Sequence, residues 1–369
     1  MGAPRLLLLA GALVLTLCVP TGVAHASPWS DRVDGWQTSS PADVGLSKSA
    51  LRIHAGFARE RGSSCLAVVR RGRLAADWNW GTPRTTPREV FSITKSVTSA
   101  LVGIAVADGS LALDDKVARY VPQWRGTASA GVTVRNLLAN DSGRFWSAES
   151  DYSLLIKAPN RTGYAVGLSQ QYPVGSAWAY NNAAIQVLDA VLRKATGKPT
   201  DAFAQQRLFG PLEMSHTRMT RDASRRSTQV FFGLQTTCLD LARFGELYLH
   251  RGRVDGTRIL PRSFVRASVG RSSTPLNAAY GYLWWLNRSG PLRGATDPVD
   301  AAGQPLVPRT GQLAPAASSR MFAALGLGGQ VLMVDPGTGT IAVRLGTNLT
   351  EPAGRSFAEV AAIVTDAVR

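Results

Sequence analysis

Ser92-Ile93-Thr94-Lys95 places a serine and a lysine three positions apart in an apolar run with helical periodicity. On a helix, side chains three positions apart share one face, with their Cβ atoms about 5–6 Å apart. A serine hydroxyl is a weak nucleophile until a base takes its proton, and a partly desolvated lysine is neutral often enough to act as that base. The chain has six lysines, and only Lys95 follows a serine at this spacing. The pattern predicts a Ser–Lys nucleophile at a helix start, although an N-capping serine beside a surface lysine fits the same residues.

Tyr180-Asn181-Asn182 is a second candidate element. A tyrosine whose pKa is lowered by the lysine can shuttle a proton, and the carboxamide of Asn182 can share its pocket wall. A buried tyrosine with its hydroxyl satisfied by the backbone is the alternative.

The third element runs from Gly326 through Gly328 to Gln330, at the end of an expected strand. Glycines there let the backbone approach a ligand and offer N–H groups to an oxyanion. A tight β-turn explains the same residues without a ligand.

Other hydrolase signatures are missing from the sequence. No serine lies in a G-x-S-x-G motif, there is no H-E-x-x-H, and no Cys/His cluster has metal-binding spacing. None of His54, His216 and His250 lies near a convincing nucleophile. We therefore expect neither a Ser-His-Asp triad nor a metal or organic cofactor.

Residues 1–26 have the pattern of a signal peptide. Arg5 is followed by an apolar segment at 6–19 and by the small-x-small sequence Ala24-His25-Ala26. The sequence therefore predicts a secreted, extracytoplasmic protein with no transmembrane segment after cleavage; an uncleaved anchor is the alternative. Cleavage removes Cys18, so Cys65 and Cys238 either form a disulfide or remain as two separate buried thiols.

The composition is that of a soluble globular enzyme, with 45% hydrophobic and 18% charged residues among 369. The formal net charge is +16, a value that can attract anionic cell-wall polymers or membranes. The basic residues are scattered, with Arg70-Arg71 and Arg225-Arg226 as the longest runs, and no basic segment is interleaved with aromatics. This distribution favours a solvated basic surface over a nucleic-acid-binding one.

The order of expected elements indicates an α+β fold. We expect a mostly antiparallel sheet flanked by helices, plus an inserted all-helical lobe. Helices are predicted at 49–61, 92–106, 182–195, 239–249 and 357–368; strands at 65–70, 74–80, 280–286, 321–326, 331–334 and 340–345; and a surface loop at 290–320.

Together, in this order, the three elements resemble the serine β-lactamase and penicillin-binding protein superfamily, and most closely its class C branch. Further similar segments are 108–115, 132–138 with Ser142-Gly143, 211–214 and 236–245. The resemblance implies one catalytic unit at 27–369, with an α/β part (27–90 and 255–369), a helical part (91–254) and the active site between these two parts. It also implies that Ser92 is acylated, that Lys95 and Tyr180 move the proton, and that Asn182 positions the substrate. The oxyanion would lie between the Ser92 N–H and one from the 326–330 strand.

One departure from the family pattern bears on the substrate. Lactamases and carboxypeptidases of this superfamily usually carry Lys-Thr-Gly or His-x-Gly on that strand, whereas residues 323–329 contain no cation. Arg309 and Arg320 are candidate replacements. The sequence therefore predicts a hydrolase of a small ester or amide. The alternatives are a penicillin-binding D-alanyl-D-alanine carboxypeptidase or β-lactamase, and a non-catalytic cell-wall-binding member of the fold.

Overall fold

The computed structural model describes residues 1–2, 32–346 and 353–369, without the side chains of 353–356. The predicted signal peptide lies outside these ranges except for its first two residues. Among the described helices, none has the length and apolar character that a bilayer span requires.

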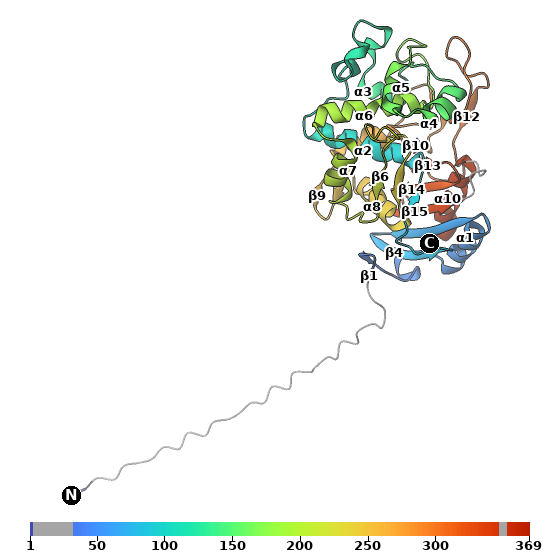
Figure 1. Ribbon diagram of the computed structural model, residues 1–369. Helices are drawn as coiled ribbons and strands as arrows, with labels where there is room; N and C mark the ends of the chain where they lie inside the picture. Colours follow the sequence, from blue (N-terminus) through green and yellow to red (C-terminus); the bar gives the residue numbers. More distant parts are fainter. Residues whose placement is uncertain (3–31, 347–352) are drawn as a thin grey trace.

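A six-stranded antiparallel sheet forms the centre of the fold, in the order β10-β13-β14-β15-β3-β4 (Figure 1). Its strands are β3 (Ser63–Arg70), β4 (Arg73–Asn79), β10 (Trp285–Leu286), β13 (Phe322–Gly326), β14 (Gln330–Asp335) and β15 (Thr340–Gly346). Strands from the two ends of the chain therefore meet where β15 pairs with β3, with Ile341 opposite Val69.

Helices cover both faces of this sheet. Helices α1 (Lys48–Glu60) and α10 (Ala353–Ala367) pack together on one face. On the other face, α8 (Cys238–Leu249) packs against β3, β14 and β15, and α2 (Ile93–Ala107) against β13 and β14. At Gly245 of α8, an added Cβ would lie 3.0 Å from Ile341, so this glycine allows the close approach of helix and sheet.

A helical region lies beyond α2, at the end of the molecule opposite β4 (Figure 1). Its helices are α3 (Val134–Ala139), α4 (Leu155–Lys157), α5 (Arg161–Gly167), α6 (Asn182–Thr196) and α7 (Thr200–Ala204), while α9 (Arg262–Val269) packs on α2. Single turns are η1 (Ala42–Val44), η2 (Val117–Arg119), η3 (Pro122–Trp124), η4 (Ala128–Gly131), η5 (Ser150–Leu154) and η6 (Gln205–Phe209).

Short strands complete the described part. They are β1 (Arg32–Val33), β2 (Trp36–Gln37), β5 (Arg88–Glu89), β6 (Arg218–Met219), β7 (Leu234–Thr236), β8 (Arg253–Val254), β9 (Thr257–Arg258), β11 (Gly290–Leu292) and β12 (Arg309–Gly311). Strands β5, β7 and β6 form a small sheet beside the start of α2.

Helix α2 is buried almost all round, and it lies between the sheet and α6. Its hydroxyls are used as anchors: Ser96 Oγ donates to Leu283 O at 2.7 Å, and Thr98 Oγ1 to Val230 O at 2.7 Å. Buried polar groups need such partners, and these bonds fix the rotation of the helix about its axis. The residues at its start therefore have a defined orientation.

The predicted α+β fold with a mostly antiparallel sheet is confirmed. Two local predictions are wrong. Only Trp285–Leu286 of the predicted strand at 280–286 forms a strand, because Leu283 has a φ of 59° and the chain turns there. The predicted loop at 290–320 contains the β11–β12 hairpin.

Candidate active site

Ser92 occupies the N-cap position of α2 without a capping side-chain hydrogen bond, directly after a strained residue. Phe91 has a φ of 49°, a conformation that costs a non-glycine residue roughly 1–3 kcal/mol. The carboxylate of Glu89 holds this turn, because its Oε1 accepts from Phe91 N at 2.8 Å and from Gly233 N at 3.0 Å. Burial raises the pKa of Glu89. No motif in the sequence marks Glu89, because its hydrogen bond with Gly233 spans 144 residues of chain.

Lys95 lies beneath the serine and is 1% exposed. Its Nζ is 2.7 Å from Ser92 Oγ and donates to Phe231 O at 2.9 Å. Burial lowers the pKa of Lys95 to about 7, because the charged ammonium loses its hydration. A substantial fraction of Lys95 is therefore neutral near pH 7, at hydrogen-bond distance from the hydroxyl that it would deprotonate.

Tyr180 lies against the same pair of residues. Lys95 Nζ is 4.7 Å from its ring centroid, and the ring stacks on Trp285 with centroids 5.5 Å apart. Burial raises the pKa of Tyr180, although a hydrogen bond with Ser92 opposes the shift. The expectation of a lysine-lowered tyrosine pKa is therefore wrong, because the desolvation of the phenolate is the largest effect on Tyr180. Tyr180 stays protonated and is suited to donate a proton.

Asp151, a second residue that no sequence motif marks, supports the start of α6. It is fully buried and accepts from Asn182 N at 2.6 Å and Ala183 N at 3.0 Å, two N–H groups at a helix N-terminus. Burial raises its pKa to about 6. Its negative charge acts on Lys95 and raises the lysine pKa against the effect of burial.

Asn181 and Asn182, which follow Tyr180, have different structural roles. Asn181 Oδ1 accepts from Ala184 N at 2.7 Å and so caps α6. Asn182 is 3% exposed, and within the described residues its Oδ1 is buried without a hydrogen-bond partner. Because an unpaired buried oxygen costs free energy, this carboxamide is poised to accept a hydrogen bond from a bound molecule.

Gly326 brings β13 against the segment that precedes Ser92. A Cβ on Gly326 would lie 2.3 Å from Val90 O, so only glycine permits this contact. The hairpin then turns through Leu327, Gly328 and Gly329, with φ of 76° and 74° at the two glycines. Strand β10 pairs only with Phe322 and Ala323 of β13, which leaves the edge nearer the serine without a strand partner among the described residues.

The side chain of Gln330 is occupied elsewhere. Its Nε2 donates to Gly346 O at 2.7 Å, and its Oε1 accepts from Gly346 N at 3.0 Å. Gln330 thus ties the β13–β14 turn to the end of β15. The side chain of Gln330 therefore positions this turn, while the expected contribution of the 326–330 backbone to an oxyanion site stays a prediction.

Neither arginine proposed as a replacement cation lies at this edge. Arg309 in β12 pairs with Asp297, and the guanidinium of Arg320 lies near Gly337 in the β14–β15 turn. Since Arg320 precedes β13 and Gly326 ends it, the two lie at opposite ends of that strand.

The histidines and acidic residues form no alternative site in the part of the chain that is described. His54 pairs with Asp366, His216 with Asp34 and His250 with Glu246. No group of three or more His, Cys, Asp or Glu side chains suited to a metal ion occurs among the described residues.

A disulfide joins Cys65 in β3 to Cys238 at the start of α8, with their Cα atoms 6.4 Å apart. Of the two alternatives left open by the sequence, the structure therefore has the disulfide. The bond connects residues 173 positions apart and fixes α8 to the sheet.

A sheet with a helical region inserted, and a Ser–Lys pair at their junction, define a class of serine hydrolases. A family model described as Beta-lactamase matches residues 53–365, and the chain belongs to that family.

Curated relatives of this chain include several hydrolases. Esterase EstB of Burkholderia gladioli is 31% identical over 171 residues, covering 40% of this chain and 42% of the esterase. A D-aminopeptidase of Cereibacter sphaeroides is 26% identical over 186 residues, covering 44% of this chain and 34% of that enzyme. The chain thus matches less than half the length of either enzyme.

Solved structures show the same fold at low identity. A putative 6-aminohexanoate-dimer hydrolase from Bacillus anthracis matches with a TM-score of 0.69 and 19% identity, covering 85% of this chain and 80% of that one.

Proposed function

We propose that the protein hydrolyses a small, neutral ester or amide through an acyl-enzyme on Ser92. The observation that carries this proposal is the buried Lys95 amine, 2.7 Å from Ser92 Oγ and with its pKa lowered to about 7. Family membership supports the reaction class, and the relative named esterase supports the ester as substrate.

In the proposed reaction, neutral Lys95 takes the proton of Ser92 as Oγ attacks the carbonyl carbon. The resulting oxyanion accepts hydrogen bonds from the Ser92 N–H, at the N-terminus of α2, and from an N–H of the 326–330 segment. Tyr180 donates its proton to the leaving group and regains one from the Lys95 ammonium. Water then attacks the acyl-enzyme, and the carboxylic acid leaves as Ser92 recovers its proton.

The surroundings of Ser92 favour a neutral substrate. Tyr180, Trp285 and Tyr280 form an aromatic cluster next to the serine, and neither candidate arginine lies at the free edge of β13. At this edge, neither Arg309 nor Arg320 would meet a substrate carboxylate in place of the cation that the lactamases carry. Asn182 Oδ1 remains to accept a hydrogen bond from a substrate N–H or O–H.

We propose further that the protein is exported. The Cys65–Cys238 disulfide supports this location, since disulfides persist in oxidising compartments. The predicted signal peptide at 1–26 agrees with it.

Intact-mass measurement after treatment with a fluorophosphonate tests the nucleophile. We expect a single adduct that Ser92→Ala abolishes, whereas Ser99→Ala, a matched serine on the same helix, keeps it. Retention of the adduct in Ser92→Ala would refute the assignment.

A substrate panel tests the specificity. We expect turnover of p-nitrophenyl esters with neutral acyl groups, and slower turnover when the acyl group carries a carboxylate. D-amino-acid peptides are the second candidate substrates, because a relative is named D-aminopeptidase. A stable penicillin adduct or D-alanine release would favour this second function. Binding of a cell-wall fragment without any acylation would favour a non-catalytic role.

A further inference from the structure

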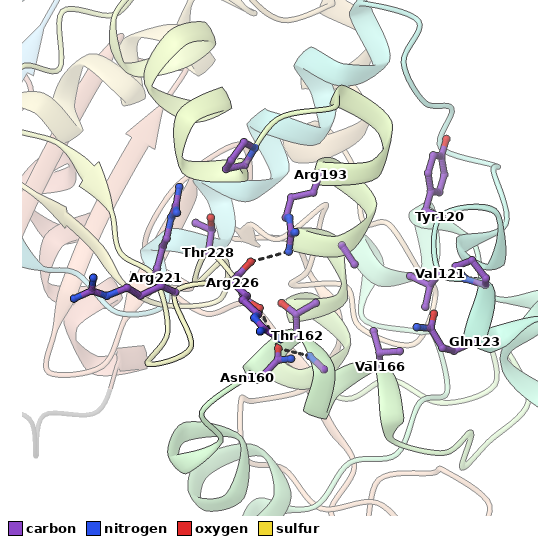
Figure 2. A pocket seen from close by; sticks show the side chains of 16 residues that line it. Tyr120, Val121, Gln123, Asn160, Thr162, Val166, Arg193, Arg221, Arg226 and Thr228 are labelled. Atoms are coloured by element: carbon purple, nitrogen blue, oxygen red, sulfur yellow. Dashed lines mark hydrogen bonds between the residues drawn. The ribbon is translucent and has the colours of Figure 1, made fainter.

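The C-terminal end of α6 borders a hollow of about 530 Å³ (Figure 2). Arg193 and Arg226 lie on one side of it, and Tyr120, Val121 and Gln123 on the other. Its lining also includes Arg221 and Arg225. A second hollow of about 400 Å³ shares Arg193 and adds Lys194 and Lys198. We call the two hollows together the basic groove.

The basic groove has more positive than negative charge. Its six cations are Arg193, Lys194, Lys198, Arg221, Arg225 and Arg226. Three acids lie nearby. Asp201 pairs with Arg221 at 2.8 Å and Asp189 with Arg193 at 3.8 Å, while the buried Asp222 accepts from Arg161 N at 2.9 Å.

Arg225 and Arg226 have no ion-pair partner among the described residues, and both are exposed. They occupy the tip of a hairpin in which Arg221 pairs with Thr228. Arg225 has a φ of 57°, a strained conformation for a residue with a side chain. Arg193 Nη1 donates to Arg226 O at 2.7 Å, which fastens the hairpin to α6.

Helix stabilisation accounts for only part of this cluster. Cations in the last turn of a helix, such as Arg193 and Lys194, interact favourably with the helix dipole. Arg225 and Arg226 belong to a loop and have no such role. Two adjacent, unpaired guanidinium groups beside an open hollow are suited to bind an anion.

We propose that the basic groove binds a polymer whose repeating groups are phosphates. Guanidinium groups hold phosphate oxygens through paired N–H donors, which gives arginine an advantage over lysine at such contacts. Two hollows in series, joined at Arg193, fit an extended chain better than one small ion. Gly163, Val166 and Ala190 provide an uncharged lining, so the phosphates face the arginine side.

The groove is separate from the catalytic residues and does not depend on the proposed esterase activity. Binding there would hold the protein on a polyanionic surface while Ser92 stays accessible to small substrates.

Fluorescence anisotropy with fluorescein-labelled inorganic polyphosphate tests the proposal on the intact protein. We expect Arg225→Gln/Arg226→Gln to weaken polyphosphate binding about ten-fold. The slope of the logarithm of the binding constant against the logarithm of the salt concentration should become shallower by about one to two. The control is Arg262→Gln/Arg266→Gln, which removes two exposed arginines of α9 with no ion-pair partner among the described residues. It should change the affinity by less than about two-fold.

Equal losses of polyphosphate affinity in the two double variants would overturn the proposal, because the net charge alone would then explain binding. So would Arg225-dependent binding to phosphatidylglycerol vesicles without binding to soluble polyphosphate, since the ligand would then be a lipid headgroup. The thermal midpoint and the fluorophosphonate labelling of the hairpin variant should match those of the wild type, which distinguishes a lost ligand site from a folding defect.

Discussion

The two ends of helix α6 show what burial does to a charged group. At the N-terminal end, Asp151 and Lys95 are both within 1% of complete burial, and their pKa values are displaced in opposite directions, to about 6 and about 7. At the C-terminal end, Arg193 and the nearby Arg225 and Arg226 are exposed to solvent.

Burial makes the charged form of a lysine costly, so the group readily gives up or accepts a proton near neutral pH. An exposed arginine keeps its charge and acts at a distance, through attraction that salt screens. One helix therefore joins a region suited to proton transfer to a region suited to anion binding.

Replacing the buried lysine should have the largest effect. Lys95→Ala should lower kcat/KM for a hydrolysed ester by about a thousand-fold or more, because Ser92 loses its base. Lys194→Ala, at the other end of α6, should change it by less than two-fold. A Lys95→Ala variant that retains a tenth of the activity would contradict the assigned role.

Removal of the disulfide should lower the stability of the fold that carries both ends of α6. Cys65→Ala/Cys238→Ala should lower the free energy of unfolding by about 2–5 kcal/mol, because the unfolded chain regains a long loop. Urea denaturation measures this change. The pH profile of the hydrolysis and the affinity for polyphosphate should stay as in the wild type; a shift in either one would mean that the disulfide shapes that site.

Asp151→Asn should move the pH profile. Activity requires neutral Lys95, so it rises with pH through the lysine pKa of about 7. Removing the carboxylate charge that raises this pKa should shift the acid limb of kcat/KM to lower pH. The variant should also lose about 1–3 kcal/mol of stability, because an amide cannot accept both N–H groups of α6. An unmoved acid limb would show that another group sets it.

The smallest effect is expected for a partly solvent-exposed carboxylate at the other end of α6. Asp201→Asn breaks the ion pair with Arg221 at the basic groove, where solvent screens the charges. The free energy of unfolding should change by less than about 1 kcal/mol, and the acid limb should not move. Thermal unfolding and the same pH profile check both statements.

Features encoded over a few residues were predictable from the sequence. The helix that begins after Ser92 follows from its apolar run and its spacing. The β3–β4 hairpin follows from Arg71-Gly72. These two residues have φ of 53° and 73°, as required of a two-residue turn that joins strands with a right-handed twist. Tyr180 and Asn182 were found because their family motif is contiguous.

Features that depend on distant contacts were not predictable. Asp151 meets Asn182 across 31 positions and lies in no motif. The sequence does not reveal that the side chain of Gln330 bonds to the backbone of Gly346, 16 positions further along the chain. The pKa of Tyr180 depends on its burial against Trp285. The aromatic-rich sequence of 280–286 does not reveal whether this segment forms a strand or packs its rings against Tyr180.

The pairing of β3 with β15 has a consequence for how the chain folds. This interior pairing joins residues near 66 to residues near 344, so it cannot form until almost the whole chain is available. Contacts of such long sequence separation slow folding, because the intervening chain must first be brought together. Helices α4 to α7 contact one another over much shorter separations and can gain structure earlier. During synthesis, β3 can pair with β4 but must remain unpaired on the side that later receives β15.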